Sequence, residues 1–374
     1  MPRLSAEPEI VKFARFDAVQ YEHDWSPENY DPYRAKQAME DHLDEAVEAE
    51  RLGWDGYFVT EHHFDAYTLA PQPNLFLAAV AARTSKMRLG QGVQILPVHN
   101  PVWLAEQYGM LDVLSGGRLE VGVGRGNFEV EWDRYAEDHA DAPALFDENL
   151  ELLDRALTQT GFTIDNPKYG ASEATTVYPR PIQDPLPRWI AAVSPGSVER
   201  VARLGHNLAA PAIPDNCERL ERFVEIAEKH GHDLSGANYV ITLPVVCAPT
   251  DHEAEAIRER AKKLVVASLE ARGLGTDNPQ AKAMVAGLSN PLAGSPATVR
   301  DQLAELLQTT GARRMMLVIR NRGLHGEVSR QTQKLLAEDV FPQLRHLSTP
   351  GSVVTTDARS DAALLGDPRP TSNV

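Results

Sequence analysis

The sequence predicts an α/β fold, a closed (β/α)8 barrel of the TIM type. Two observations carry this prediction: short apolar segments alternate with segments of helical periodicity, and the alternation repeats eight times along the 374 residues. Regular alternation of strands and helices indicates a parallel sheet, and eight such units suggest a sheet that closes on itself. An open, doubly wound sheet is the alternative, because it is built from the same units.

Eight apolar segments are the predicted strands. The second of them, Gly56 to Glu61, is a short apolar run that ends in a charged, imidazole-rich loop. Short apolar runs bounded by turn residues suit strands that are covered on both faces. In chain order the predicted strands are 11–20, 56–61, 87–96, 118–123, 189–193, 207–212, 239–247 and 313–320.

Segments with helical periodicity fill the intervals between these strands. The helix that opens at Asn100-Pro101 carries two start signals, a capping side chain and a proline in the first turn. Asn74 is a candidate cap for the helix before it. The predicted helices are 33–52, 74–84, 100–114, 142–160, 194–205, 218–230, 251–269, 295–309 and 328–347.

Composition narrows the class of protein. With 37 basic and 53 acidic side chains, the formal net charge is −16, which argues against nucleic-acid or anionic-membrane binding as a main role. The two cysteines, Cys217 and Cys247, show no paired spacing and fit structural thiols in a reducing compartment. Residues 1–10 lack an apolar signal core, and no run approaches the roughly 20 apolar residues of a membrane span. We therefore expect a cytoplasmic protein.

We expect one barrel domain over residues 11–347. Residues 1–10 would be an N-terminal extension, and the polar stretch 348–374 a flexible C-terminal tail. Two segments rich in Gly and Pro, near 161–187 and 270–293, lack a helical period and are predicted excursions from the regular repeat.

Glu61-His62-His63 follows the second predicted strand, at the end where the sites of parallel α/β folds are built. Successive residues of an extended chain point in opposite directions, so at most one histidine should face the barrel mouth. The carboxylates Glu61 and Asp65 make a metal site a candidate, but adjacent histidines rarely bind one ion and no further ligand set is evident. We favour a histidine that acts as acid, base or hydrogen-bond donor, with a merely polar strand end as the alternative.

Two motifs at later strand ends suggest an anion site. In Gly122-Val123-Gly124-Arg125-Gly126, the glycines would let a planar ligand lie close to the backbone, and Arg125 offers its fork to a phosphate. Ser194-Pro195-Gly196-Ser197 opens a helix, whose free N–H groups and dipole attract anions. A tight turn and a simple helix cap are the respective alternatives. Together the two motifs favour a phosphate site.

Glycines also interrupt the third predicted strand. Gly90 and Gly92 lie within the segment Leu89 to Gln94. Glycine inside a central strand weakens it and often marks a bulge or the close approach of a ligand. Packing against a large neighbouring side chain is the alternative.

Motifs of this kind follow one another in a fixed order: Glu61-His62-His63-Phe64, Leu96-Pro97-Val98-His99-Asn100-Pro101, Ala105-Glu106-Gln107, and the segments 111–118, 122–126, 194–199 and 293–299. Any one of them is weak, but their order and spacing resemble the bacterial luciferase-like flavin-dependent monooxygenase family over about residues 11–347. The resemblance implies a luciferase-like TIM barrel that binds reduced FMN (FMNH2) at its C-terminal mouth.

The resemblance also implies a reaction and its partners. A separate flavin reductase would supply FMNH2, and O2 would form a peroxyflavin that inserts one oxygen atom into a small, mainly apolar organic substrate. A homodimer is expected from the family. Two alternatives remain at this point: a deazaflavin-dependent oxidoreductase that transfers hydride without O2, and a non-catalytic flavin-binding barrel.

By position, the resemblance assigns roles to individual residues. His62 resembles the catalytic histidine, and Arg125, Ser194 and Ser197 match phosphate-contacting positions. The Gly92-Val93 bond falls where the family often has a non-proline cis peptide beside the flavin ring. Segment 270–293 occupies the place of a mobile lid that would exclude water from the site. We expect no bound metal.

Overall fold

The computed structural model describes residues 10–23, 26–64, 68–126, 129–135, 138–166, 168–211, 216–271, 292–320, 324 and 326–347. The expected tail 348–374, nearly all of the N-terminal extension and most of segment 270–293 lie outside the described residues.

The described strands form a closed parallel barrel with eight strand positions, which confirms the predicted fold class and rules out the open sheet. Each pairs in parallel with the next, and the last pairs back onto the first. In barrel order they are β1 (Lys12–Asp17), β2 (Gly56–Val59), β3 (Arg88–Gln91) continued by β4 (Gln94–Ile95), β5 (Leu119–Gly124), β8 (Arg188–Ala191), β9 (Asn207–Pro211), β10 (Tyr239–Cys247) and β12 (Arg314–Val318).

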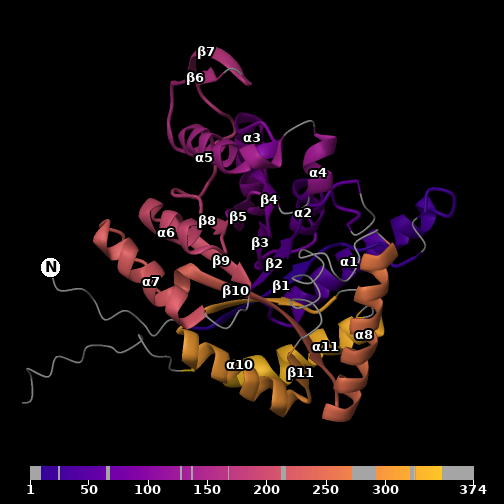
Figure 1. Ribbon diagram of the computed structural model, residues 1–374. Helices are drawn as coiled ribbons and strands as arrows, with labels where there is room; N and C mark the ends of the chain where they lie inside the picture. Colours follow the sequence, from indigo (N-terminus) through magenta and orange to yellow (C-terminus); the bar gives the residue numbers. More distant parts are fainter. Residues whose placement is uncertain are drawn as a thin grey trace, which may run out of the picture.

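Helices surround this barrel (Figure 1). The longer ones are α1 (Pro32–Arg51), α2 (Pro73–Ala81), α3 (Pro101–Ser115), α5 (Ala142–Thr158), α6 (Pro195–Leu204), α7 (Asn216–Lys229), α8 (Asp251–Ala271), α10 (Pro296–Thr310) and α11 (Glu327–Leu335). Shorter segments are α4 (Glu129–Arg134), α12 (Phe341–Leu344), a π-helical turn at Leu336–Val340, and single turns at Leu96–Val98, His139–Asp141 and Gly236–Asn238. Among the described residues, no helix combines the length and apolar content needed to cross a membrane.

Local start signals fix the beginnings of most helices. Asn100 caps α3 by accepting the Val102 amide at 2.9 Å, as predicted. The prediction for Asn74 was wrong, because α2 begins at Pro73 and the Asn74 amide is buried. Its side chain instead accepts a hydrogen bond from Gln91 at 2.6 Å and donates one to Gln94 at 3.1 Å. It therefore supports the strand β3–β4 from outside the barrel.

Two further pieces lie outside the eight-strand pattern. Strands β6 (Phe162–Asn166) and β7 (Gly170–Thr175) form a separate antiparallel hairpin within the 161–187 segment, which extends beyond α5 at the top of Figure 1. Strand β11 (Leu292–Gly294) pairs in parallel with the end of β10.

Alternating side chains divide the core into two parts. Inside the barrel, a cluster that includes Phe58, Trp189, Val240 and Met316 fills the space between the strands. The larger core lies between the outer side of the strands and the helices. Because all barrel strands are parallel, their carboxyl ends meet at one mouth, and the predicted site residues follow those ends.

A buried network of charged and polar side chains connects the first and last strands, where the barrel closes. Arg15 on β1 contacts Glu45 of α1 and Gln333 of α11, and its side chain is fully buried. Arg320, just after β12, donates to the same Glu45 at 2.5 Å and to Glu22 at 3.0 Å. These contacts join the first strand and first helix to the last strand and a late helix.

Candidate active site at the carboxyl end of the barrel

The two adjacent histidines after β2 point in opposite directions, as strand alternation predicts. The side chain of His62 keeps 21% of its surface exposed, whereas that of His63 keeps 6%. The Nδ1 atom of His62 lies 3.2 Å from Oε1 of Glu131, and Nε2 of His63 lies 2.6 Å from Oε1 of Glu61. Only His62 is thus placed to reach a ligand from this pair.

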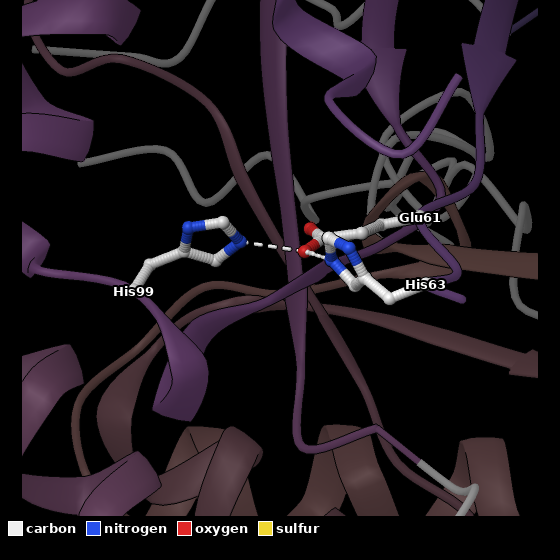
Figure 2. Close-up of side chains that lie close together, drawn as sticks. All are labelled: Glu61, His63 and His99. Carbon is white, nitrogen blue, oxygen red and sulfur yellow. Dashed lines mark hydrogen bonds and ion pairs between the residues drawn. The ribbon is translucent and has the colours of Figure 1, made fainter. Parts of the chain in front are cut away.

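Figure 2 shows Glu61 between two imidazoles, those of His63 and His99. The Nε2 atoms of both rings lie 2.6 Å from Glu61 Oε1, and Oε2 accepts the Ile95 amide at 3.0 Å. Burial alone raises the pKa of a carboxyl group, but the hydrogen bonds from His63 and His99 outweigh it and hold the pKa of Glu61 at about 2. Glu61 is therefore a carboxylate that accepts a proton-bearing nitrogen from each ring.

The other nitrogen of His63 completes this cluster. Its Nδ1 lies 2.9 Å from the hydroxyl of Tyr135, which follows α4. Burial and the negative charges of Glu61 and Glu131 raise the pKa of Tyr135 to about 12, so this hydroxyl keeps its proton and donates it to His63. His63 is thus bonded through both ring nitrogens, which gives it a supporting place.

Glu61, His63 and His99 also place three possible metal-ligand atoms within 4.8 Å of one another. His99, which comes from the turn after β4, was not predicted to join this cluster. A cation here would have to displace the protons that both rings donate to one carboxylate oxygen. The hydrogen-bonded arrangement is the one that this geometry fits, and the absence of a metal remains a prediction.

The Gly92–Val93 peptide bond, between β3 and β4, is cis, as the resemblance implied. Val93 packs against β5: a Cβ atom at Gly124 would lie 2.6 Å from Val93 Cγ2. A Cβ at Gly122 would lie 1.9 Å from the carbonyl oxygen of Gln91. The missing side chains at these two glycines therefore allow the neighbouring segment to approach β5 closely. This corrects our interpretation that the glycines make room for a ligand.

Three predicted residues meet in one cavity of about 280 Å³. Arg125 follows β5, and Ser194 and Ser197 begin α6 after β8; all three line the cavity. Ser194 caps the helix by accepting the Ser197 amide at 3.3 Å, and the two hydroxyl oxygens lie 2.9 Å apart. The cap interpretation and the anion-site interpretation are both compatible with this geometry, because Ser194 is exposed and Ser197 is only half-buried.

A second cation lines the same cavity and was missed by the sequence analysis. Arg200 lies one helical turn after Ser197 and forms an ion pair with Asp147 of α5. Burial and the positive charge of Arg125, which lines the same cavity, lower the pKa of Arg200. The spacing of three residues along a helix was the signal that could have found it.

The donor set of this cavity fits a phosphate group. Two arginines, two hydroxyl groups and the amino end of a ten-residue helix all offer donors to an anion. His62 and the Gly92–Val93 bond are not part of the cavity lining given by the described residues. Val93 lies next to the cavity lining, because it packs against Gly124, the residue before Arg125.

A closed parallel barrel with an anion cavity and an imidazole at its carboxyl end has the architecture of a barrel enzyme. The sequence model of the luciferase-like monooxygenases matches residues 25–314. The chain therefore belongs to the luciferase-like monooxygenase family.

Individual relatives agree with this assignment. The chain is 25% identical to limonene 1,2-monooxygenase of Rhodococcus erythropolis over 88% of this chain and 87% of that one. It is 30% identical to the oxygenase component of a flavin-dependent trigonelline monooxygenase of Acinetobacter baylyi, over 52% and 54%. The crystal structure of monooxygenase RslO1 from Streptomyces bottropensis superimposes with a TM-score of 0.75, at 26% identity over 89% and 99%. The chain spans about half the length of several relatives that it matches, the Acinetobacter component among them.

Proposed function

We propose that this chain is the oxygenase component of a two-component monooxygenase that uses FMNH2 and O2. It would insert one oxygen atom into a small, mainly apolar organic substrate. The observation that carries the proposal is the cavity where Arg125, Ser194 and Ser197 converge beside the cis Gly92–Val93 bond. A flavin bound there would supply the redox chemistry with O2.

The chain's own residues would bind and orient this cofactor. The two arginines and the first turn of α6 would hold the phosphate of FMN by charge-assisted hydrogen bonds. The Gly92–Val93 segment would support the ring system, and His62 would hold or move a proton beside it. Both cysteines are free thiols, which supports a reducing compartment, and we propose the cytoplasm.

The cofactor can be tested by binding alone. Absorbance and fluorescence titrations with FMN, riboflavin and a deazaflavin would be compared under anaerobic reducing conditions. We expect tight binding of reduced FMN and weaker binding of riboflavin, which lacks the phosphate. Tighter binding of the deazaflavin than of FMN would contradict the proposal. It would favour a deazaflavin-dependent hydride transfer on the same barrel.

The reaction and its partner need a coupled assay. The Acinetobacter relative is named as an oxygenase component, which supports a separate reductase as the source of FMNH2. The limonene enzyme supports a small apolar substrate. A flavin reductase, NADH and FMN would be combined with the chain and a panel of terpenes, aldehydes and ketones, and mass spectrometry would look for products that gain one oxygen from 18O2. If every compound is returned unchanged while reduced FMN binds, a non-catalytic barrel is favoured.

We also propose a homodimer formed through helices α2 and α3. Several large apolar side chains are exposed there, including Leu75 at 74% and Trp103 at 66%. Leu114, near the end of α3, is also exposed. Light scattering of the wild-type protein should give twice the mass of one chain. The L114D variant should give the mass of one chain. A wild-type chain of single mass at micromolar concentration contradicts the dimer.

A further inference from the structure

Glu131 is a buried carboxylate at the edge of the candidate site. It lies on the short helix α4, and 4% of its side-chain surface is exposed. Its Oε1 atom accepts the backbone N–H of His63 at 2.8 Å and lies 3.2 Å from Nδ1 of His62. Its Oε2 atom is buried with no hydrogen-bond partner in the described part of the chain. Buried carboxylate oxygens are rarely left in this condition, so the position of Glu131 calls for a reason.

The contacts of Glu131 define where the proton of His62 lies. An oxygen of the Glu131 carboxylate carries no proton, so Oε1 accepts from His62 as it does from the His63 amide. The proton between them is therefore carried by Nδ1 of His62. In a neutral imidazole only one nitrogen carries a proton, so Nε2 of His62 is left as the acceptor.

His63 provides an internal reference, because its contacts define the opposite tautomer. Its Nε2 donates to the Glu61 carboxylate, and its Nδ1 accepts from Tyr135. Two adjacent imidazoles are thus held in opposite tautomers by two different glutamates. One of these glutamates, Glu61, follows the same strand, whereas Glu131 reaches His62 from another element of the barrel mouth.

We propose that Glu131 is the positioning residue of His62. It holds the imidazole in the form protonated at Nδ1 and thereby makes Nε2 the atom that accepts a proton or hydrogen bond from the reacting groups. The use of that atom in a reaction rests on the proposed function. The tautomer itself does not, because it follows from contacts within this chain.

A purely structural role is the competing explanation. Glu131 could simply fasten α4 to the loop after β2 through the His63 amide. Two substitutions separate the explanations: E131L removes the acceptor, and E131Q keeps an acceptor oxygen without the charge. D133N on the same helix, where Asp133 is exposed, is the matched control.

Nitrogen NMR of the histidine side chains reads the tautomer directly. The protein would be labelled with 15N-histidine, and the signal of His62 would be identified among the 12 histidines by its loss in H62A. In the wild-type chain and in D133N, we expect the protonated-nitrogen shift at Nδ1 of His62. In E131L we expect the population to move toward the Nε2-protonated form, which predominates in free imidazole side chains, and E131Q should restore most of the wild-type pattern.

Binding of FMN supplies the second measurement. E131L should bind reduced FMN within about twofold of the wild-type affinity, since Glu131 does not line the phosphate cavity. A wild-type His62 protonated at Nε2 overturns the inference without any variant, as does a folded E131L that keeps the Nδ1-protonated form. Failure of the wild-type chain to bind FMN would instead overturn the proposed function and leave the tautomer result intact.

Discussion

At the end of β2, most candidate site side chains are buried and bonded to one another, whereas those at the ends of β5 and β8 are more exposed. Glu61, His63 and His99 use polar atoms on internal hydrogen bonds, and the His62 ring is the most exposed of the four, at 21%. Around the cavity, Arg125 and Ser194 are exposed and Ser197 is half-buried, so their donors can turn toward a ligand. The first region is organised by contacts within the chain, and under the proposed function the second would be completed by the phosphate of FMN. We therefore expect changes in the first to affect chemistry and stability, and changes in the second to affect binding.

The largest expected effect is the loss of reaction in H62A. Removing an acid or base that acts in the rate-limiting proton transfer lowers a rate by roughly 100- to 10,000-fold. Binding of FMN should be retained, because His62 does not line the phosphate cavity. The loss of reaction is measured as product formed per NADH in the reductase-coupled assay. Retention of FMN binding is measured by flavin titration. H252A, which changes an exposed histidine on α8, is the control, and a normal product yield in H62A would remove His62 from the mechanism.

The next effect is on stability, at Glu61. Lowering a carboxyl pKa from 4.5 to about 2 corresponds to roughly 3 kcal/mol of folding free energy. The sign follows from the depressed pKa: this stability is present above the unfolded value and is lost as the pH falls toward 2. Urea unfolding should therefore give a larger free energy of unfolding for wild type than for E61Q at pH 7. This difference should shrink between pH 5 and pH 2.

The exposed residue Glu106 of α3 gives the matched control E106Q, for which we expect a small and pH-independent difference. A gap between wild type and E61Q that stays constant down to pH 2 contradicts the buried carboxylate.

Binding should respond most to Arg125. Charge-assisted hydrogen bonds contribute about 1.5–3 kcal/mol, so R125Q should weaken FMN binding by roughly 10- to 100-fold. Riboflavin, which has no phosphate, should bind both forms alike. R203Q removes an exposed arginine of α6 that pairs with Glu199 and should leave FMN affinity unchanged. Equal weakening of FMN and riboflavin in R125Q would show that this arginine does not contact the phosphate.

The smallest expected effect is a gain, in D147N. Arg200 is shared between Asp147 and the cavity, so removing the carboxylate frees the guanidinium for the ligand. Exposed ion pairs contribute about 0.2–1 kcal/mol, which predicts FMN binding up to about fivefold tighter. Titrations at low and high salt measure this gain, which should shrink as salt screens the charges. D165N on the β6–β7 hairpin changes the net charge equally and should not alter affinity; weaker binding in D147N contradicts the shared arginine.

Features that depend on nearby residues could be predicted from the sequence. Strand alternation predicted that at most one histidine of the pair faces the mouth, and the two side chains do differ in exposure and in hydrogen-bond partners. The cap at Asn100 follows from two adjacent residues. All eight predicted strand segments overlap a barrel strand. In each case the determining contacts lie within a few residues, where periodicity and start signals act.

Partners brought together by the barrel could not be predicted in this way. His62 and Glu131 are 69 residues apart, and Glu61 and His99 are 38 apart. The local sequence around an acidic residue in a loop does not indicate which strand end that residue will contact. The glycines of β5 show the same limit, because their need for space comes from Val93 and Gln91 on a neighbouring strand.

The charge network at the closure of the barrel has a consequence for synthesis of the protein. Arg15 and Glu45 are made early, but Gln333 and Arg320, which complete their contacts, are made near the end. Strand β1 therefore has no partner on one side until β12 leaves the ribosome. During most of translation the nascent chain therefore has an open sheet edge at β1, and Glu45 of α1 lacks its later counter-ion Arg320. Pairing of β12 with β1 then closes this edge, and the completed barrel buries Arg15, Glu45 and Arg320 together.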